Sequence, residues 1–191
     1  MLLKLKLLLA RALRAVSRRL GRTGGTTLPG RVLLRLDSHA IGELGARLER
    51  GSVLVSATNG KTTTASMLAS VLERSGATVV HNRAGSNMHW GVATALLDAG
   101  RSPGQIGLFE VDEAWLAPVA RELDPPLVLL SNLFRDQLDR YGELELLADR
   151  WAELVASRDG RTTFVLNADD PLAELPVTVR VAPRALRVIQ P

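Results

Sequence analysis

A short polar turn carries the residues best suited to chemistry. An apolar run ending at Ser56 leads into it, and a helix-like stretch follows from Lys61. Gly60 lets backbone N–H groups approach a phosphate, Lys61 offers a positive charge to the β- and γ-phosphates, and the Thr62 hydroxyl is suited to Mg²⁺. The positive end of the helix dipole favours the same anion. The turn therefore predicts a phosphate-binding loop, with candidate ATP-binding residues Thr58, Asn59, Gly60, Lys61, Thr62 and Thr63.

This turn is a variant of the common phosphate-loop pattern. The strict pattern places a glycine six residues before the lysine, and Val55 stands there in this chain. The alternative interpretation is an ordinary strand, turn and helix, in which Thr58 or Asn59 caps the helix.

An acidic segment follows the apolar run that ends at residue 109. Glu110 comes first after that run and is a candidate Mg²⁺ ligand together with Thr62, directly or through water. Asp112 and Glu113 are expected in the first turn of a helix, where acidic side chains favour the helix dipole. A solvated loop acid is the alternative for Glu110.

Two more polar segments follow apolar runs. The segment 132–142 is dense in hydrogen-bonding side chains, which is typical of a ligand-contacting loop, although a charged surface turn has the same composition. In the segment 167–171, asparagine suits an adenine edge and aspartate a ribose hydroxyl, but these residues also favour turns. The candidate ATP contacts here are Asn132, Asn167, Asp169 and Asp170.

The segment 81–91 is rich in small and amide residues that suit a ligand beyond the γ-phosphate. His81 and His89 lie in it without a third ligand in view, so we do not predict a metal site there. The candidate substrate-side residues are Asn82, Ser86 and Asn87 from this segment, and Asp136 and Gln137 from the segment 132–142.

These polar segments require a scaffold in which several strands end at one edge. From residue 52 onward, strand-like runs that are apolar throughout alternate with helix-like stretches, which predicts an α/β fold with a parallel sheet covered on both faces. Ligands of such sheets bind at the carboxyl ends of the strands. Strands are expected at 31–36, 52–56, 78–81, 106–110, 127–131 and 163–166, and helices at 61–75, 91–99, 113–122 and 143–157, with a short helix ending at Leu48.

The N-terminus differs from the rest in charge. Residues 1–36 hold nine of the 24 basic residues and no acidic one, which leaves 15 basic and 20 acidic residues, a net charge of −5, in the remainder. The body of the chain is therefore not a nucleic-acid-binding domain by composition. Residues 1–20 predict a basic amphipathic helix, too short and too charged to span a bilayer. It suits either an anionic membrane surface or packing on its own domain or on a partner.

Taken in order, these segments resemble a known family. The turn at 58–63, Glu110, the segment 132–140 and the segment 167–170 resemble the central ATPase domain of the Mur ligases. Within that family, the segments 82–88, 109–114 and 132–143 are similar to the MurT-type subunits of lipid II isoglutaminyl synthase, and Gln137 stands where amide-bond-forming Mur ligases usually have histidine. The resemblance runs from about residue 1 to residue 172.

The resemblance implies a specific activity. MurT-type subunits use ATP and Mg²⁺ to convert the α-carboxylate of D-glutamate in the lipid II stem peptide to an acyl phosphate. Ammonia from a GatD-type glutaminase partner then gives D-isoglutamine. A cytoplasmic location follows, with peripheral contact at the inner face of the membrane through residues 1–20 as one option. Lys61, with Mg²⁺ on Thr62 and Glu110, would stabilise the transferred phosphoryl group.

The chain also departs from the family. Family members are longer and carry a cysteine-ligated zinc ribbon and a C-terminal domain with a catalytic aspartate, whereas this chain has no cysteine, and Ala57 stands where many Mur ligases have glycine. We therefore expect no family catalytic residue here. The alternatives are an amino-acid-adding Mur ligase, a relative of folylpolyglutamate synthase, or a non-catalytic nucleotide-binding fragment. The expected organisation is a basic helix at 1–22, a linker and N-terminal segment at 23–50, an incomplete ATP-binding domain at 51–175 and an unassigned tail at 176–191.

Overall fold

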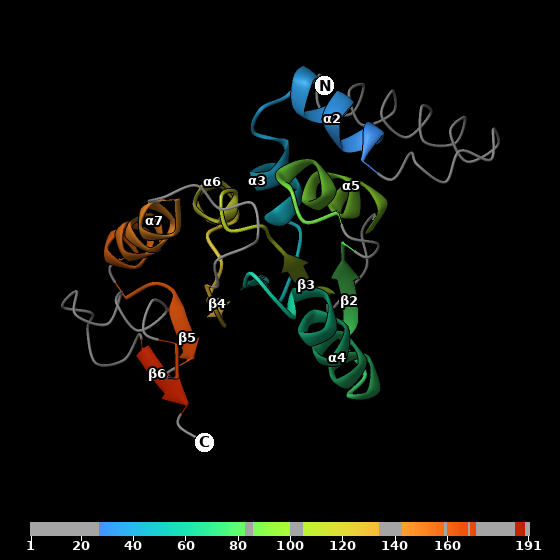
Figure 1. Cartoon of the computed structure of the whole chain (residues 1–191). Helices are drawn as coiled ribbons and strands as arrows, with labels where there is room; N and C mark the ends of the chain where they lie inside the picture. The colour runs from blue at the N-terminus through green and yellow to red at the C-terminus, as the bar shows by residue number, and fades with distance from the viewer. Residues whose placement is uncertain are drawn as a thin grey trace.

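A six-stranded parallel sheet forms the centre of the computed structural model (Figure 1), in the order β2-β3-β1-β4-β5-β6. The structure describes residues 27–82, 86–99, 105–133, 143–158, 160–167, 169–170 and 186–189. The strands are β1 (Ser52–Ser56), β2 (Thr78–His81), β3 (Gln105–Glu110), β4 (Leu127–Leu130), β5 (Thr163–Asn167) and β6 (Leu186–Ile189). The described helices are α2 (Leu28–Leu36), α3 (Ala40–Gly45), α4 (Lys61–Arg74), α5 (His89–Ala99), α6 (Leu116–Leu123) and α7 (Glu143–Ser157).

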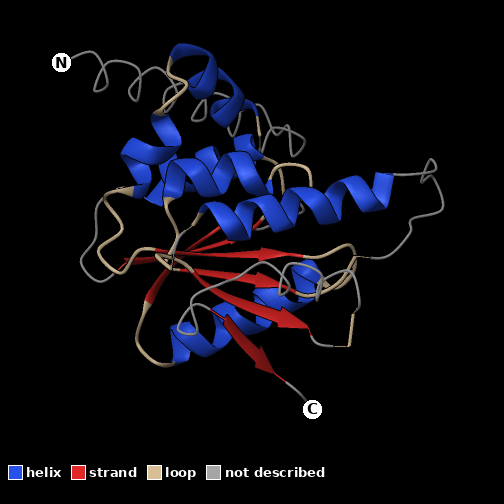
Figure 2. Ribbon diagram, turned by 90° about the vertical axis from the view of Figure 1, so that its left-hand side faces the viewer, coloured by secondary structure: helices blue, strands red, loops and turns tan. Residues whose placement is uncertain are grey.

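Helices cover both faces of the sheet, as the apolar strands predict. Successive residues of β1 point to opposite faces: Leu54 belongs to the larger core under α3, α5, α6 and α7, and Val55 to the smaller core under α4. Figure 2 shows α4 on one side of the sheet and the other described helices on the opposite side. Within the described residues, no helix is long and apolar enough to cross a membrane.

The structure confirms the strands and helices expected between residues 52 and 167, with shifts of at most three residues at their ends. β6 was not expected and adds a sixth parallel strand beside β5. The expected helix at 1–22, the candidates Asp136 and Gln137, and residues 176–185 lie outside the described residues.

The strand expected at 31–36 is wrong, because this segment belongs to helix α2. Pro29 stands in the first turn of α2, where its fixed φ suits a helix start and its missing N–H costs no hydrogen bond. Leu33 is fully buried in the larger core. Packing of this face, and not the apolar composition, decides the local structure.

The packing of α2 on α5 depends on a glycine. The backbone N–H of Gly30 donates to Thr94 Oγ1 at 3.0 Å, and a Cβ at this position would lie 1.9 Å from the carbonyl oxygen of Trp90. Only a residue without a side chain allows this approach. Residues 28–48 therefore share one core with the sheet, through Leu33, Ile41 and Leu44 among others.

Candidate nucleotide-binding site

The turn between β1 and α4 leaves the start of α4 open to an anion. Gly60 is the N-cap residue, with φ of 81° in the left-handed region that favours glycine. Gly60 has no side chain to cap α4, and the first turn of α4 holds no acidic residue. The alternative placed Thr58 or Asn59 at the N-cap, and the structure places Gly60 there instead. The first N–H groups of a helix lack partners within the helix, so this end suits a phosphate.

Lys61 is held in an ion pair. Its Nζ donates to Glu113 Oε2 at 3.1 Å, to the carbonyl oxygen of Thr58 at 3.5 Å and to that of Ala57. The side chains of Lys61 and Glu113 are each only 11% exposed. In this state, a carboxylate and two carbonyl oxygens take the positions at Lys61 that phosphate oxygens would occupy.

The position of Glu113 corrects a sequence prediction. α6 begins at Leu116, so Asp112 and Glu113 precede the helix and are not in its first turn. Asp112 Oδ1 accepts a hydrogen bond from the N–H of Ala114 at 3.2 Å and stabilises the turn. Sequence reasoning missed the Lys61–Glu113 pair, although an acid shortly after a strand that neighbours the lysine's loop is a signal that could have indicated it.

Thr62 and Glu110 meet as the sequence predicts. Thr62 Oγ1 donates to Glu110 Oε1 at 3.0 Å, and Glu110 is 2% exposed at the carboxyl end of β3. A hydroxyl and a carboxylate are oxygen ligands of the kind that Mg²⁺ prefers. The described residues contain no group of three or more His, Cys, Asp or Glu side chains that could hold a metal ion. Mg²⁺ here would therefore need phosphate oxygens or water as its other ligands, which is its usual mode with nucleotides.

A hollow of about 220 Å³ lies directly beside this pair. Both Thr62 and Glu110 contribute to its lining, which also includes Ser66, Ala69, Ser70, Glu73 and His81. His81 is fixed through Nδ1, 2.7 Å from the carbonyl oxygen of Leu108. Space for water or a ligand group is thus present next to the predicted metal ligands.

Asn82 holds Glu110 in place. Its Oδ1 accepts from the backbone N–H of Glu110 at 2.9 Å, and its Nδ2 donates to the carbonyl oxygens of Glu110 at 2.7 Å and Ser86 at 2.8 Å. Asn82 is buried, and its amide is engaged with the protein. The structure gives Asn82 a positioning role, which the sequence did not indicate.

The other substrate-side candidates in this segment lie close to the acidic turn. The carbonyl oxygen of Asn87 accepts from the N–H of Asp112 at 2.8 Å. Ser86 is buried, and its Oγ has no hydrogen-bond partner among the described residues. Substrate contact by Ser86 and Asn87 stays a prediction.

Asn132 braces the phosphate loop from β4. Its Oδ1 accepts from the N–H of Asn59 at 2.9 Å, and its Nδ2 donates to the carbonyl oxygen of Asn59 at 3.0 Å. Its own carbonyl oxygen accepts from the N–H of Thr58 at 2.9 Å. The structure thus joins Asn132 to the loop predicted to bind ATP, and its side chain shapes that loop.

The candidates after β5 divide into two roles. Asp170 is buried, and its Oδ2 accepts from the N–H of Leu133 at 2.8 Å, which ties the end of β5 to the end of β4. Asp169 is exposed, and its N–H donates to Asn167 Oδ1 at 3.1 Å in a turn. Contact of Asn167 and Asp169 with a nucleoside stays a prediction, whereas Asp170 holds the framework.

Comparison with known proteins identifies the domain type. Residues 55–185 match the Mur ligase middle domain. The chain is 33% identical over 163 residues to the MurT subunit of lipid II isoglutaminyl synthase from Staphylococcus aureus strain N315, covering 85% of this chain and 36% of that protein. With the MurT subunit from Streptococcus pneumoniae it shares 36% identity over 170 residues, 88% of this chain and 37% of the relative. The chain thus spans about a third of the length of these relatives.

Solved structures give the same fold. The MurF ligase from Thermotoga maritima in complex with ADP superposes with a TM-score of 0.63 at 21% sequence identity, over 80% of this chain and 35% of that chain. A MurF structure from Acinetobacter baumannii reaches a TM-score of 0.65 at 19% identity, over 83% and 34% of the respective chains. At these identities the likeness shows the fold alone.

Proposed function

The chain belongs to the Mur ligase family, and on that premise we propose that its site binds Mg·ATP as the phosphoryl donor of a ligase reaction in peptidoglycan synthesis. The observation that carries the proposal is the convergence of Lys61, Thr62 and Glu110 at the uncapped start of α4. The phosphates would lie against the first turn of α4. Mg²⁺, when bound, would neutralise charge on the phosphate oxygens.

Nucleotide binding changes the partners of Lys61 in this proposal. Its Nζ leaves Glu113 and the loop carbonyls and turns to the β- and γ-phosphates. Glu110, fixed by Asn82, and the hydroxyl of Thr62 keep their positions, because their protein contacts do not compete with phosphate. Asn167 and Asp169 contact the nucleoside, and Asn132 and Asp170 keep the surrounding loops in place.

The MurT relatives suggest the substrate. We propose the α-carboxylate of D-glutamate in the lipid II stem peptide as acceptor, with Asp136, Gln137, Ser86 and Asn87 on its side of the γ-phosphate. A carboxylate oxygen bonds to the γ-phosphorus while the bond to ADP breaks. Ammonia then attacks the acyl carbon, phosphate leaves, and loss of a proton gives the amide of D-isoglutamine. Phosphoryl transfer of this kind depends on positioning and charge stabilisation, which this site provides.

The proposed partners follow from the same relatives. A GatD-type glutaminase supplies ammonia, and lipid II brings the reaction to the cytoplasmic face of the membrane, where residues 1–20 make peripheral contact. Zinc does not fit this chain: it contains no cysteine, and its described residues provide no cluster of three ligands.

An amidation assay tests this proposal. The chain is incubated with Mg·ATP, lipid II, glutamine and a GatD-type glutaminase, and amidated lipid II is detected by mass spectrometry, with Lys61→Ala as control. Added hydroxylamine should trap the acyl phosphate as a hydroxamate. Nucleotide binding with neither amide nor hydroxamate would contradict the assigned reaction for this chain and favour the non-catalytic nucleotide-binding fragment. Product formed only when D-glutamate or another amino acid replaces ammonia would favour an amino-acid-adding ligase.

A further inference from the structure

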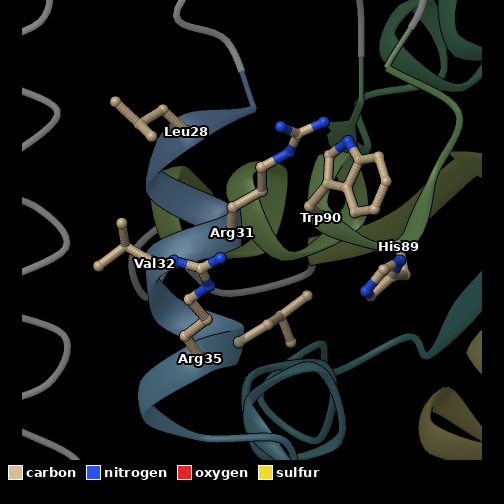
Figure 3. A pocket seen from close by; sticks show the side chains of 7 residues that line it. Leu28, Arg31, Val32, Arg35, His89 and Trp90 are labelled. Carbon is tan, nitrogen blue, oxygen red and sulfur yellow. The ribbon is translucent and has the colours of Figure 1, made fainter.

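A second hollow lies between α2 and the start of α5 and shares no lining residue with the hollow beside Thr62 and Glu110. Its volume is about 520 Å³. Figure 3 labels six of the side chains that line it: Leu28, Arg31, Val32, Arg35, His89 and Trp90. The site described above uses none of these residues.

The residues of α2 that line this hollow lie on one side of the helix. Residues three and four apart in a helix lie side by side, so Leu28, Arg31, Val32 and Arg35 form a continuous surface that alternates apolar and basic groups. Arg31 extends from α2 over the indole of Trp90, with its guanidinium carbon 4.4 Å from the ring centroid (Figure 3). This cation–π contact orients the guanidinium without neutralising it.

The positive charge of this surface is not balanced by the described residues. Neither Arg31 nor Arg35 forms an ion pair with a described residue. Both are exposed, and the first acidic residue of the chain is Asp37, after nine basic residues. A surface with this charge attracts an anionic partner.

Apolar groups surround these charges at the same surface. Leu28 lines the hollow and is 44% exposed, and Val32 and Trp90 line it and are half-buried. Arginine beside exposed leucine and tryptophan is the combination that suits the boundary between lipid headgroups and acyl chains. A soluble phosphate compound would use the arginines but would leave Leu28 in water.

We propose that α2 and Trp90 form a docking surface for the anionic headgroups of a lipid bilayer. The arginines bind headgroup phosphates, and Leu28 and Trp90 enter the interface beside them. The surface adds to any contact made by residues 1–20 and places α2 against the membrane. The proposal does not depend on the assigned ligase reaction, because it uses neither the nucleotide site nor turnover.

Vesicle binding tests this surface. The whole chain is sedimented with vesicles of phosphatidylcholine alone or mixed with phosphatidylglycerol. We expect binding to the anionic vesicles, and an approximately thirty-fold lower partition coefficient for Arg31→Gln/Arg35→Gln, about 1 kcal/mol for each arginine at the surface. The matched control is Arg74→Gln/Arg121→Gln, which removes two exposed arginines from the last turns of α4 and α6. The control should bind vesicles like the wild type, and both variants should keep wild-type affinity for Mg·ATP.

A second readout locates the contact. Brominated phosphatidylglycerol should quench tryptophan fluorescence of the wild type. Trp151 is buried, but Trp115 is half-buried with its ring centroid 5.7 Å from that of Trp90, so Trp115→Phe is the matched control. Most of the quenching should be absent in Trp90→Phe and kept in Trp115→Phe. Equal loss of binding in the two arginine pairs would overturn the proposal, since it would indicate general charge attraction. Unchanged binding of Arg31→Gln/Arg35→Gln would overturn it as well, since residues 1–26 alone would then bind. Inorganic pyrophosphate that binds the hollow while vesicles do not would replace it with a discrete phosphate site.

Discussion

Replacement of Asn132 by alanine should weaken nucleotide binding without unfolding the protein. The side chain of Asn132 is joined to the backbone of Asn59 by bonds of 2.9 and 3.0 Å and reaches Ser131 Oγ at 3.2 Å. Alanine removes these bonds but keeps the bond from Thr58 N–H to the carbonyl oxygen of residue 132. The loop then becomes less ordered before ATP binds, and binding must order it.

The size of the effect follows from these contacts. A typical protein hydrogen bond contributes about 0.5–1.5 kcal/mol net, and the two bonds to Asn59 are exposed to solvent, so each belongs near the lower end of that range. We expect a total of about 1–2 kcal/mol, which weakens ATP affinity by roughly five- to thirty-fold. Since the bonds lie at the surface, the midpoint of thermal unfolding without ATP should change little.

Isothermal titration calorimetry with Mg·ATP measures this change. Asn87→Ala is the matched control, because it removes an asparagine side chain from a different loop near the site and should leave ATP affinity unaltered. Wild-type affinity in Asn132→Ala would refute the conclusion that this amide shapes the phosphate loop. A large fall in unfolding temperature would instead indicate that Asn132 stabilises the fold as a whole.

Three further predictions concern other described residues. Glu113→Gln removes the carboxylate that holds Lys61, so ATP affinity measured by calorimetry should rise about fivefold. This corresponds to about 1 kcal/mol for a partly buried ion pair. Weaker ATP binding would instead mean that Glu113 itself takes part in binding. Gly60→Ala places a methyl group at φ of 81°, where no neighbouring atom lies within 4 Å of it. Denaturant unfolding should therefore show a free energy of unfolding lower by about 1–2 kcal/mol, from backbone strain alone. An unchanged free energy of unfolding would contradict the left-handed conformation of Gly60. Burial raises the pKa of Glu122 above its ordinary value of 4.5, which means that the fold prefers the protonated acid and loses this stability as pH rises through the raised pKa. Glu122→Gln should therefore unfold at a higher temperature than the wild type at pH 8, and the difference should vanish below pH 4.5; a constant difference at all pH values would contradict the assigned cause.

The sequence was sufficient for the elements that depend on local pattern. The apolar strands, the helix that starts at Lys61 and the meeting of Thr62 with Glu110 all follow from residue order together with the rule that parallel strands share one carboxyl edge. Gly60 was identified from its type alone, and its left-handed φ agrees with that choice.

The remaining features depend on contacts between residues far apart in sequence. Asn82 and Glu110 are 28 residues apart, and Asn132 and Asn59 are 73 apart. The sequence pattern alone assigns such polar side chains to a ligand, because it does not indicate which distant backbone groups are their hydrogen-bond partners. The strand predicted at residues 31–36 was wrong for a related reason. Valine and leucine suit a strand, but the close contact of Gly30 with α5 requires a helix here.

The Mg²⁺ dependence of ATP binding tests the central claim most directly. Calorimetric titrations with ATP are run with Mg²⁺ and with a chelator, on the wild type and on Glu110→Gln. We predict that Mg²⁺ tightens ATP binding to the wild type, and that Glu110→Gln loses most of this gain while its binding of metal-free ATP is kept or improved. Equal enhancement by Mg²⁺ in both proteins would contradict the assignment of Thr62 and Glu110 as the metal side of a nucleotide site.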